Sequence, residues 1–388
     1  MNKFGISRNT FVLGWVSFFN DIASEIIYPL LPLFLSSVLG ADKALIGLIE
    51  GIAESTASLL KLVSGWLADR TGRNKLLATL GYGASAIGRP LYALVTASWQ
   101  VLGLRFLDRV GKGLRTAPRD VMIAESTAPE AMGRAFGFHR SLDTLGAVVG
   151  PGLAIWLMAI FHQHFQSVFL AATIPGFIAL FLLFFVRDAH RSEARPLHPL
   201  RWGAFGSSFR LFIVASFVFA LGNSSNAFLI LRTQNLGVGV GLVPVVYLLY
   251  NFVYSLTAFP AGILADRLGR GRVLLSGYLV FALIYLGFAL ANQPWQAWVL
   301  FAGYGLYSGI TDGIGRAWIK EISPDTLRGS AFGIYDFAVG LAALPASLLA
   351  GAIWDHWGAS TTFLVDAGLA LAAIALFLMS IKRHRGEA

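Results

Sequence analysis

A short phrase occurs twice in this 388-residue chain, about half the chain length apart. The two copies read Gly65-Trp-Leu-Ala-Asp69-Arg70-Thr-Gly-Arg and Gly262-Ile-Leu-Ala-Asp266-Arg267-Leu-Gly-Arg. Each copy lies where an apolar run meets a cluster of basic residues, an arrangement typical of the end of a membrane helix. The repetition therefore predicts two copies of one structural unit that follow each other along the chain within a bilayer.

The composition indicates the same environment. Hydrophobic residues make up 56% of the chain and charged residues 13%, more apolar than is usual for a soluble domain. Windows of roughly 20 residues give about twelve apolar segments. Their length favours helices, because barrel strands alternate in character over about ten residues. We expect an all-α membrane protein with twelve transmembrane helices in two pseudo-symmetric six-helix bundles.

The basic residues predict the orientation. We assign 19 of the 30 Lys and Arg residues to one set of flanks, whereas the opposite flanks hold only Lys43 and Arg232. By the positive-inside rule both termini are cytoplasmic. We expect an N-terminal bundle over 1–186, a cytoplasmic linker over 187–208 and a C-terminal bundle over 209–388. The expected location is a bacterial inner membrane, and the expected assembly state is a monomer.

Several classes of function are excluded or disfavoured. Cysteine is absent, which excludes disulfides, thiolate metal sites and cysteine nucleophiles. No nucleotide-binding loop, paired-histidine helix or nucleophile elbow occurs, so we expect neither an enzyme nor a cofactor. The net charge of +9 follows the flanks of the spans and therefore does not indicate nucleic acid. The expected partners are a small-molecule substrate, protons and the lipid bilayer.

The doubled phrase resembles motif A of the Major Facilitator Superfamily, and the resemblance covers essentially the whole chain. It implies two bundles that rock about a substrate cavity, which is transport by alternating access. It also implies a cytoplasmic gate, in which the Asp69 and Asp266 carboxylates accept bonds from a helix N-terminus or a nearby arginine. The alternative is a set of loop charges that only orient the protein. The gating residues implied are Gly65, Asp69, Arg70, Gly262, Asp266 and Arg267.

Ionisable residues within the spans are unevenly distributed: we count eight acids and eight bases in the first half and four ionisable residues in the second. Such residues are costly in hydrocarbon and indicate function, although pairing in a structural network is the alternative for each. In the fourth span, spacings of three and four place Arg105, Asp108, Arg109 and Lys112 near one face. The Arg109-x-x-Lys112-Gly phrase resembles motif B of proton antiporters, which implies a proton-coupling role for Arg109.

Three carboxylates are the further candidates for proton coupling: Asp21 and Glu25 in the first span and Glu54 in the second. A carboxylate near the bilayer middle can alternate between an ion pair and a protonated form, as coupling requires. In the fifth span, Gly150-Pro151 resembles motif C of the antiporter branch, which implies a seal against leak. Ordinary small-residue packing explains the glycines equally well.

The remaining candidates are substrate-binding residues. His139, Arg140 and Asp143 precede motif C on the same helix; together with Asp21 and Glu25 they suggest a hard-cation site, but the nearby arginines oppose metal binding and we expect no metal. The first half also offers Arg105, Asp108 and Lys112. The second half offers polar surface that serves either as a substrate wall or as helix packing: Asn223, Asn226, Tyr250, Asn251, Tyr304 and Tyr335.

Motif C and the partial motif B favour proton-coupled efflux of a small organic solute. The alternative is proton-coupled uptake of an anionic metabolite, with Arg105, Arg109 and Lys112 pairing with its carboxylate or phosphate. Divalent metal transport and a non-transporting receptor are less favoured.

Overall fold

The computed structural model describes residues 7–71, 73–127, 132–187, 202, 205–324 and 327–387. The described chain is helical throughout and contains no strand, which confirms the all-α prediction. It divides into two compact units, unit 1 with residues 1–40 and 56–197, and unit 2 with residues 41–55 and 198–388. Most of the predicted linker, residues 188–201, lies outside the described part.

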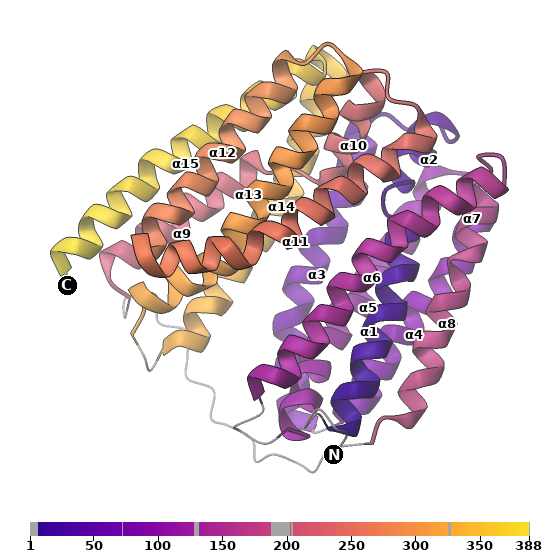
Figure 1. Ribbon diagram of the computed structural model, residues 1–388, viewed down its shortest axis with the longest axis horizontal. Helices are drawn as coiled ribbons and strands as arrows, with labels where there is room; N and C mark the ends of the chain where they lie inside the picture. The colour runs from indigo at the N-terminus through magenta and orange to yellow at the C-terminus, as the bar shows by residue number, and fades with distance from the viewer. Residues whose placement is uncertain are drawn as a thin grey trace. The chain divides into compact units, whose positions relative to one another are not determined.

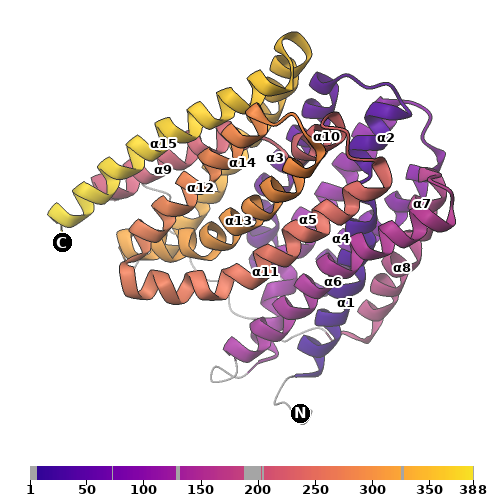
Figure 2. The same cartoon turned by 45° about the horizontal axis from the view of Figure 1, so that its top comes forward.

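Unit 1 is a bundle of nearly parallel and antiparallel helices (Figures 1 and 2). Its helices are α1 (Arg8–Ile27), α2 (Leu31–Ser37), α4 (Asn74–Leu91), α5 (Ser98–Glu125), α6 (Met132–Ile160), α7 (Phe165–Ala171) and α8 (Thr173–Leu182), together with the 3-10 turn η1 (Tyr92–Leu94). The α1 helix packs against α6 and α8, and α4 packs against α5. Ser7 caps α1 by accepting a hydrogen bond from the Thr10 amide at 3.1 Å.

Unit 2 repeats part of this packing. Its helices are α9 (Ser207–Gly222), α10 (Asn226–Asn235), α11 (Val243–Leu268), α12 (Arg270–Leu290), α13 (Pro294–Ile322), α14 (Arg328–Trp357) and α15 (Ala359–Glu387). The α9 helix packs against α14 and α15, and α12 packs against α13. These are the counterparts of the contacts of α1 with α6 and α8 and of α4 with α5, as a duplicated unit predicts.

The helix α3 (Lys43–Thr71) contributes to both units, because residues 41–55 belong to unit 2 and the remainder to unit 1. Its first part packs closely on α14. A Cβ atom added at Gly51 would come within 2.9 Å of Leu344 Cα, and the Asp355 carboxylate accepts hydrogen bonds from the Lys43 and Ala44 amides at 3.1 and 2.7 Å. The helix start is therefore held by α14.

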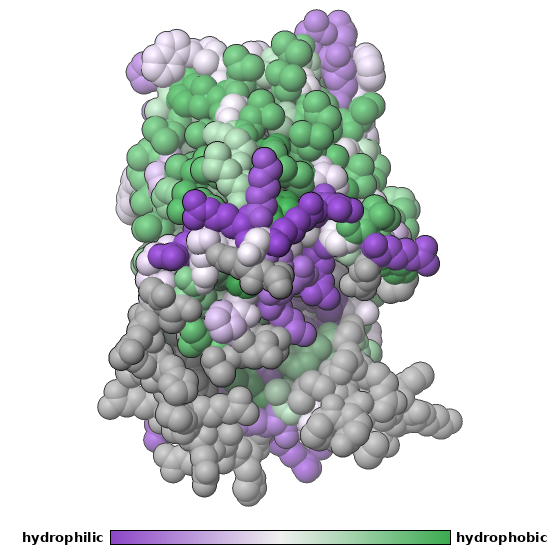
Figure 3. All heavy atoms as spheres, turned by 90° about the vertical axis from the view of Figure 1, so that its left-hand side faces the viewer, coloured by the Kyte–Doolittle hydropathy of each residue, from purple (hydrophilic) through white to green (hydrophobic). Residues whose placement is uncertain are grey.

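The surface is that of a membrane protein. Eight helical segments of the described residues are long and apolar enough to cross a bilayer. The helices α3 and α5 reach 29 and 28 residues and carry more charge. The order of elements is consistent with the predicted twelve spans. Large apolar side chains such as Leu283, Leu290 and Phe184 are more than half exposed, and hydrophobic area covers much of the face in Figure 3. Lipid would cover such a surface.

Candidate functional site

Unit 1 contains a cavity of about 330 Å³ whose wall is rich in charge. Its lining residues are Asn20, Asp21, Ser24, Glu25, Ile27, Tyr28, Lys61, Arg89, Tyr92, Arg105, Asp108, Arg109, Lys112, Arg115, Thr116, Arg119, Arg140 and Asp143. Eight of these side chains are Lys or Arg and four are Asp or Glu. The wall therefore has an excess of positive charge.

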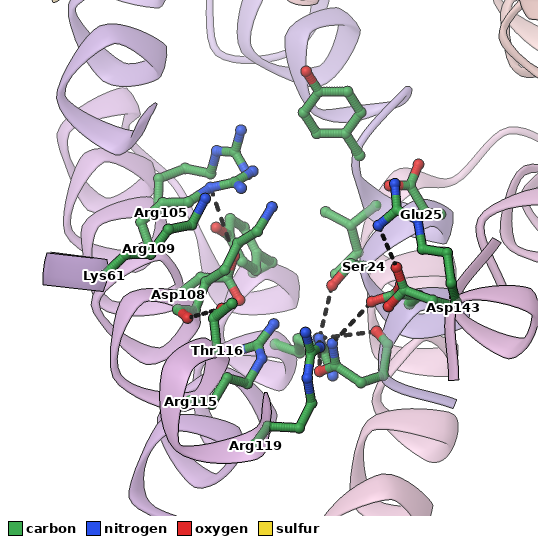
Figure 4. Close-up of a pocket in the computed structure, with 18 residues that line it drawn as sticks. Ser24, Glu25, Lys61, Arg105, Asp108, Arg109, Arg115, Thr116, Arg119 and Asp143 are labelled. Atoms are coloured by element: carbon green, nitrogen blue, oxygen red, sulfur yellow. Dashed lines mark hydrogen bonds and ion pairs between the residues drawn. The ribbon is translucent and has the colours of Figure 1, made fainter. Parts of the chain in front are cut away.

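Most basic side chains lie on one side of the cavity, together with Asp108, and the other carboxyl groups lie on the opposite side, together with Arg140. Figure 4 shows Arg105, Arg109 and Lys61 on one side, and Glu25 and Asp143 on the other. The basic side comes mainly from α5, whose helical spacing puts Arg105, Asp108, Arg109 and Lys112 on one wall. The acidic side comes from α1 and α6. A ligand in the cavity would meet cations on one flank and carboxyl groups on the other.

The arginines of α5 are buried and have neighbours that orient them. The Arg105 guanidinium lies over the Tyr28 ring, 5.4 Å from its centroid, and Arg109 Nε lies 4.0 Å from a carboxylate oxygen of Asp108. Arg115 donates a hydrogen bond to Ser85 Oγ at 2.7 Å. These side chains are 5 to 7% exposed, so their charges are directed into the cavity or toward neighbouring polar groups.

Arg89 of α4 is a cavity residue that the sequence does not single out as a site. Its Nη2 donates to the Asn20 side-chain oxygen at 2.8 Å and to Ser24 Oγ at 2.9 Å, which ties α4 to α1. Gly176 of α8 leaves room for it, since an added Cβ there would lie 2.6 Å from Arg89 Nη1. Lys61, Arg115 and Arg119 also line the cavity and are not among the site residues predicted above. The sequence signal that could have identified these residues is a charged side chain within an apolar segment.

The carboxyl groups of α1 and α6 meet on the acidic side. Asp21 and Asp143 both line the cavity there, and Asp21 accepts a hydrogen bond from the Asn20 side-chain amide at 3.2 Å. Asp143 also accepts a hydrogen bond from Arg140 at 3.1 Å. One oxygen of Glu25, Oε2, is buried and has no hydrogen-bond partner among the described residues. The acidic side therefore brings three carboxyl groups of α1 and α6 to one part of the wall.

The Gly-Pro segment of α6 supports this side. A Cβ added at Gly150 would come within 2.5 Å of Glu25 Cβ, and one added at Gly146 would come within 3.1 Å of Asp21 Cβ. Glycine at these two positions lets α6 lie directly against the α1 residues that carry the carboxylates. Pro151 is buried inside α6 and follows this contact.

Two predicted residues of the first half do not line the cavity. Glu54 belongs to the part of α3 that is grouped with unit 2. His139 is buried on α6, where its Nε2 lies 3.0 Å from Ser17 Oγ. No group of three or more His, Asp or Glu side chains within the described ranges is arranged to hold a metal ion.

The polar residues predicted in the second half gather in unit 2. The Tyr304 hydroxyl donates to the Asn226 side-chain oxygen at 2.8 Å and to that of Asn223 at 3.4 Å. The Tyr250 ring stacks on Tyr304 with centroids 5.3 Å apart. Asn251 is buried on α11, and its amide donates to the Tyr247 carbonyl.

Tyr335 lies apart from this hydrogen-bonded group, since its ring stacks on Phe212 with centroids 6.0 Å apart. The tyrosine rings thus pack against other aromatic rings. The tyrosine hydroxyls and the asparagine amides supply polar groups to the interior of unit 2.

The predicted gate residues are only partly described. The structure does not describe the side chains of Asp69, Arg70 and Asp266, nor the surroundings of Gly65. Arg267 is exposed near the end of α11. A Cβ added at Gly262 would meet no atom within 4 Å, so the packing of described residues does not require glycine there.

Known proteins share both the sequence and the fold. The sequence pattern of the Major Facilitator Superfamily matches residues 13–231 and 211–388. An uncharacterized MFS-type transporter of Methanocaldococcus jannaschii is 35% identical over 381 residues, which span 96% of this chain and 95% of the relative. The multidrug resistance protein MdtG of Escherichia fergusonii is 23% identical over 397 residues, 97% of this chain and 96% of that protein.

Among solved structures, the nucleoside transporter NupG matches with a TM-score of 0.81 at 15% identity, over 96% of this chain and all of that one. The all-helical units, the doubled phrase and the match along the whole chain agree with one another. This integral multi-pass membrane protein belongs to the Major Facilitator Superfamily of transporters.

Proposed function

We propose that the protein transports a small organic anion by alternating access, together with protons that bind in the same cavity. The observation that carries this proposal is the cavity of unit 1, with eight basic and four acidic side chains around about 330 Å³. Buried arginines bind carboxylate and phosphate groups through paired, charge-assisted hydrogen bonds. An anion held by Arg105, Arg109 and Lys112 would balance the excess charge of the wall.

The acidic side of the same cavity supports proton coupling. Asp21, Glu25 and Asp143 are close to the proposed anion position, so each can change its protonation when the anion arrives or leaves. A bound anion favours protonation of these groups, and protonation in turn favours the anion, so the charge linkage loads the anion and the proton together, as symport requires. Binding and proton exchange are thus linked by charge within one cavity.

The second candidate function is export in exchange for protons, which the similarity to a multidrug resistance protein favours. The Gly150 contact between α6 and α1 supports the role of a seal beside the proton-carrying groups. We further propose that the protein is a monomer in a bacterial inner membrane. Both termini lie in the cytoplasm in this proposal, as the basic flanks predict.

The test is transport by the full-length protein in proteoliposomes. A thermal-shift screen with organic phosphates, dicarboxylates, tricarboxylates and neutral solutes selects the compound, which is then radiolabelled. Exchange with protons predicts faster entry when the vesicle lumen is acidic. Uptake by symport predicts faster entry when the outside is acidic. If the screen selects only neutral solutes, the substrate is not an anion. If the transport rates are equal under both pH gradients, transport is not coupled to protons.

A matched pair of variants connects the activity to the cavity. Arg109→Gln should weaken anion binding roughly 10- to 100-fold, because it removes a charged hydrogen-bond donor. Arg272→Gln removes an exposed cation of α12 and should leave binding unchanged. Equal affinities in the two variants would place the anion elsewhere.

A further inference from the structure

The apolar segment Ser207–Asn235 of unit 2 is interrupted between its two helices. The α9 helix ends at Gly222, Asn223 has φ −107° and ψ 70°, and α10 begins at Asn226. No proline occurs at the break. A helix end inside a membrane leaves carbonyl groups without helical partners, and this is tolerated only where other polar groups or a bound ion satisfy them.

A buried carboxylate lies at this break. Asp366 of α15 is 3% exposed and accepts a hydrogen bond from Ser224 Oγ at 3.1 Å. The backbones are close as well, because a Cβ added at Gly222 would lie 2.6 Å from the Asp366 carbonyl oxygen. The carboxylate and the negative end of the α9 dipole therefore meet at one place, and both favour a positive charge.

The break also holds hydroxyl groups and a second carboxylate. Ser225 Oγ donates a hydrogen bond to Glu50 of α3 at 3.4 Å, and Glu50 is 1% exposed. The Tyr285 hydroxyl of α12 is buried without a hydrogen-bond partner among the described residues, and the Tyr285 ring lies 6.2 Å from that of Tyr304. No salt bridge to Asp366 occurs within the described part of the chain.

The charged groups of the neighbouring elements are engaged elsewhere. Arg232 of α10 donates to the Phe288 and Ala291 carbonyls at 3.1 and 2.7 Å. Arg316 of α13 pairs with Asp336 of α14 at 3.2 Å. Arg270 of α12 pairs with Glu321 at 3.3 Å. Arg210 of α9 is exposed, as are Asp355 and His356 of α14. Asp366 is thus a buried acid whose charge no cation of the described protein balances.

We propose that Asp366 and the break between α9 and α10 form a binding site for a monovalent cation, either a proton or Na⁺. A carboxylate without a partner is strongly disfavoured inside a membrane, so it takes up a proton or a metal cation. Carboxylate, hydroxyl and carbonyl oxygens are the ligands that hard cations prefer, and unwound helix ends hold coupling ions in other transporters. This site lies in unit 2 and uses none of the residues of the anion cavity.

The experiment uses the purified full-length protein and measures thermal unfolding. One series titrates NaCl against choline chloride at constant ionic strength and alkaline pH, and a second varies pH without Na⁺. A Na⁺ site predicts stabilisation by Na⁺ that choline does not give. A proton site predicts stabilisation on acidification and no Na⁺ effect. In Asp366→Asn the Na⁺ response should disappear, or the stabilisation by acid should fall to the part contributed by the unit 1 carboxyl groups. Both responses should persist in Glu321→Gln, which changes an exposed carboxylate of unit 2.

A second variant keeps the test decisive if Asp366→Asn fails to fold. Ser224→Ala retains the carboxylate and removes its donor, so the half-saturating Na⁺ concentration or the proton activity at the midpoint should shift by about tenfold. Infrared difference spectra should contain a protonated carboxyl band at acidic pH if the ion is a proton. Responses to Na⁺ and pH that are identical in the wild type, Asp366→Asn and Ser224→Ala would overturn the proposal.

Discussion

At the scale of single residues, the arginines of the cavity differ in how they are held. Arg89 makes hydrogen bonds to Asn20 and Ser24, and Arg115 bonds Ser85 and lies over the Tyr82 ring at 4.8 Å. Arg140, in contrast, is 66% exposed. Arginines with fixed partners shape the wall, and their planar guanidinium groups cannot be replaced by a lysine ammonium without loss of geometry.

Arg89→Leu should destabilise the protein by about 1–3 kcal/mol, because it leaves the buried Asn20 and Ser24 oxygens without their donor. Thermal unfolding of the purified variant measures the change. Arg272→Leu, at an exposed position of α12, should unfold at the temperature of the wild type. An Arg89→Leu protein of unchanged stability would mean that Arg89 does not hold α1 and α4 together.

Glu25 and Glu54 provide a comparison between two acids that the sequence ranks equally. Glu25 lines the cavity, whereas Glu54 belongs to the part of α3 grouped with unit 2. Glu25→Gln should abolish proton-driven transport and retain counterflow exchange, since exchange needs no net proton movement. Glu54→Gln should retain both. The measurement is labelled substrate uptake with and without a pH gradient, and the reverse pattern would make Glu54 the coupling residue.

The candidate residues could be predicted only where one helix carries them all. The spacing of Arg105, Asp108 and Lys112 within α5 is enough to place them on one wall. Arg89 contacts α1, and no periodicity in either helix reveals that contact. Such a pairing depends on which helices pack together, and that is a property of the tertiary structure.

At the scale of helices, the crossing of α1 and α6 depends on small residues. Gly150→Ala places a methyl group 2.5 Å from Glu25 Cβ, and overpacking of this kind costs about 1–3 kcal/mol. Gly152→Ala is the matched control, because a Cβ there would meet nothing within 4 Å. Thermal unfolding of both variants tests the contact. Equal stability of the two proteins would show that α6 can move away from α1 without loss.

The start of α3 depends on a side chain from α14. Asp355→Ala removes the acceptor of the Lys43 and Ala44 amides and should lower stability by about 1 kcal/mol. Hydrogen exchange measured by mass spectrometry should then rise in the first turn of α3. Asp355→Asn retains an acceptor oxygen and should have the smaller effect. Unchanged exchange in Asp355→Ala would mean that Asp42, which bonds the Leu45 amide, is a sufficient cap.

The sequence predicts helix breaks only in part. Between α1 and α2 the chain contains Pro29, which lacks the amide hydrogen that a helix needs. The break between α9 and α10 contains no proline. Ser225 caps α10 by accepting a hydrogen bond from the Ala227 amide, and Ser224 donates to Asp366, far away along the chain. The division of α3 between the units is also invisible in the sequence, since its apolar pattern is continuous and only its contacts with α14 distinguish the first part.

At the scale of the whole molecule, the duplicated halves differ in chemistry. The cavity of unit 1 is lined mainly by charged groups, whereas the described polar interior of unit 2 includes tyrosines, asparagines and two buried carboxylates, Glu50 and Asp366. The repeated phrase and the apolar spans predict the helical bundles, because periodicity and length are properties of the sequence. Which half binds the ligand depends on the later divergence of the two copies.

Stability of the whole chain should depend on the anions present. An anion that occupies the unit 1 cavity stabilises the native state by mass action, by about 2.7 kcal/mol at a hundredfold excess over its Kd. Phosphate should therefore raise the unfolding temperature above that in chloride of equal ionic strength. Arg109→Gln should retain only the general salt effect, which acts through the solvent. A phosphate response that is the same in both proteins would argue against an anion in the cavity.

The excess of positive charge around the cavity has a second consequence, which concerns the energy of the membrane. A pathway wide enough for a solute is also wide enough for hydrated K⁺ or Na⁺, and a leak of these ions would dissipate the membrane potential. Eight basic side chains against four acidic ones repel such cations from the wall. The basic side chains that attract an anion therefore also reduce the leak of K⁺ and Na⁺ when water fills the transport pathway.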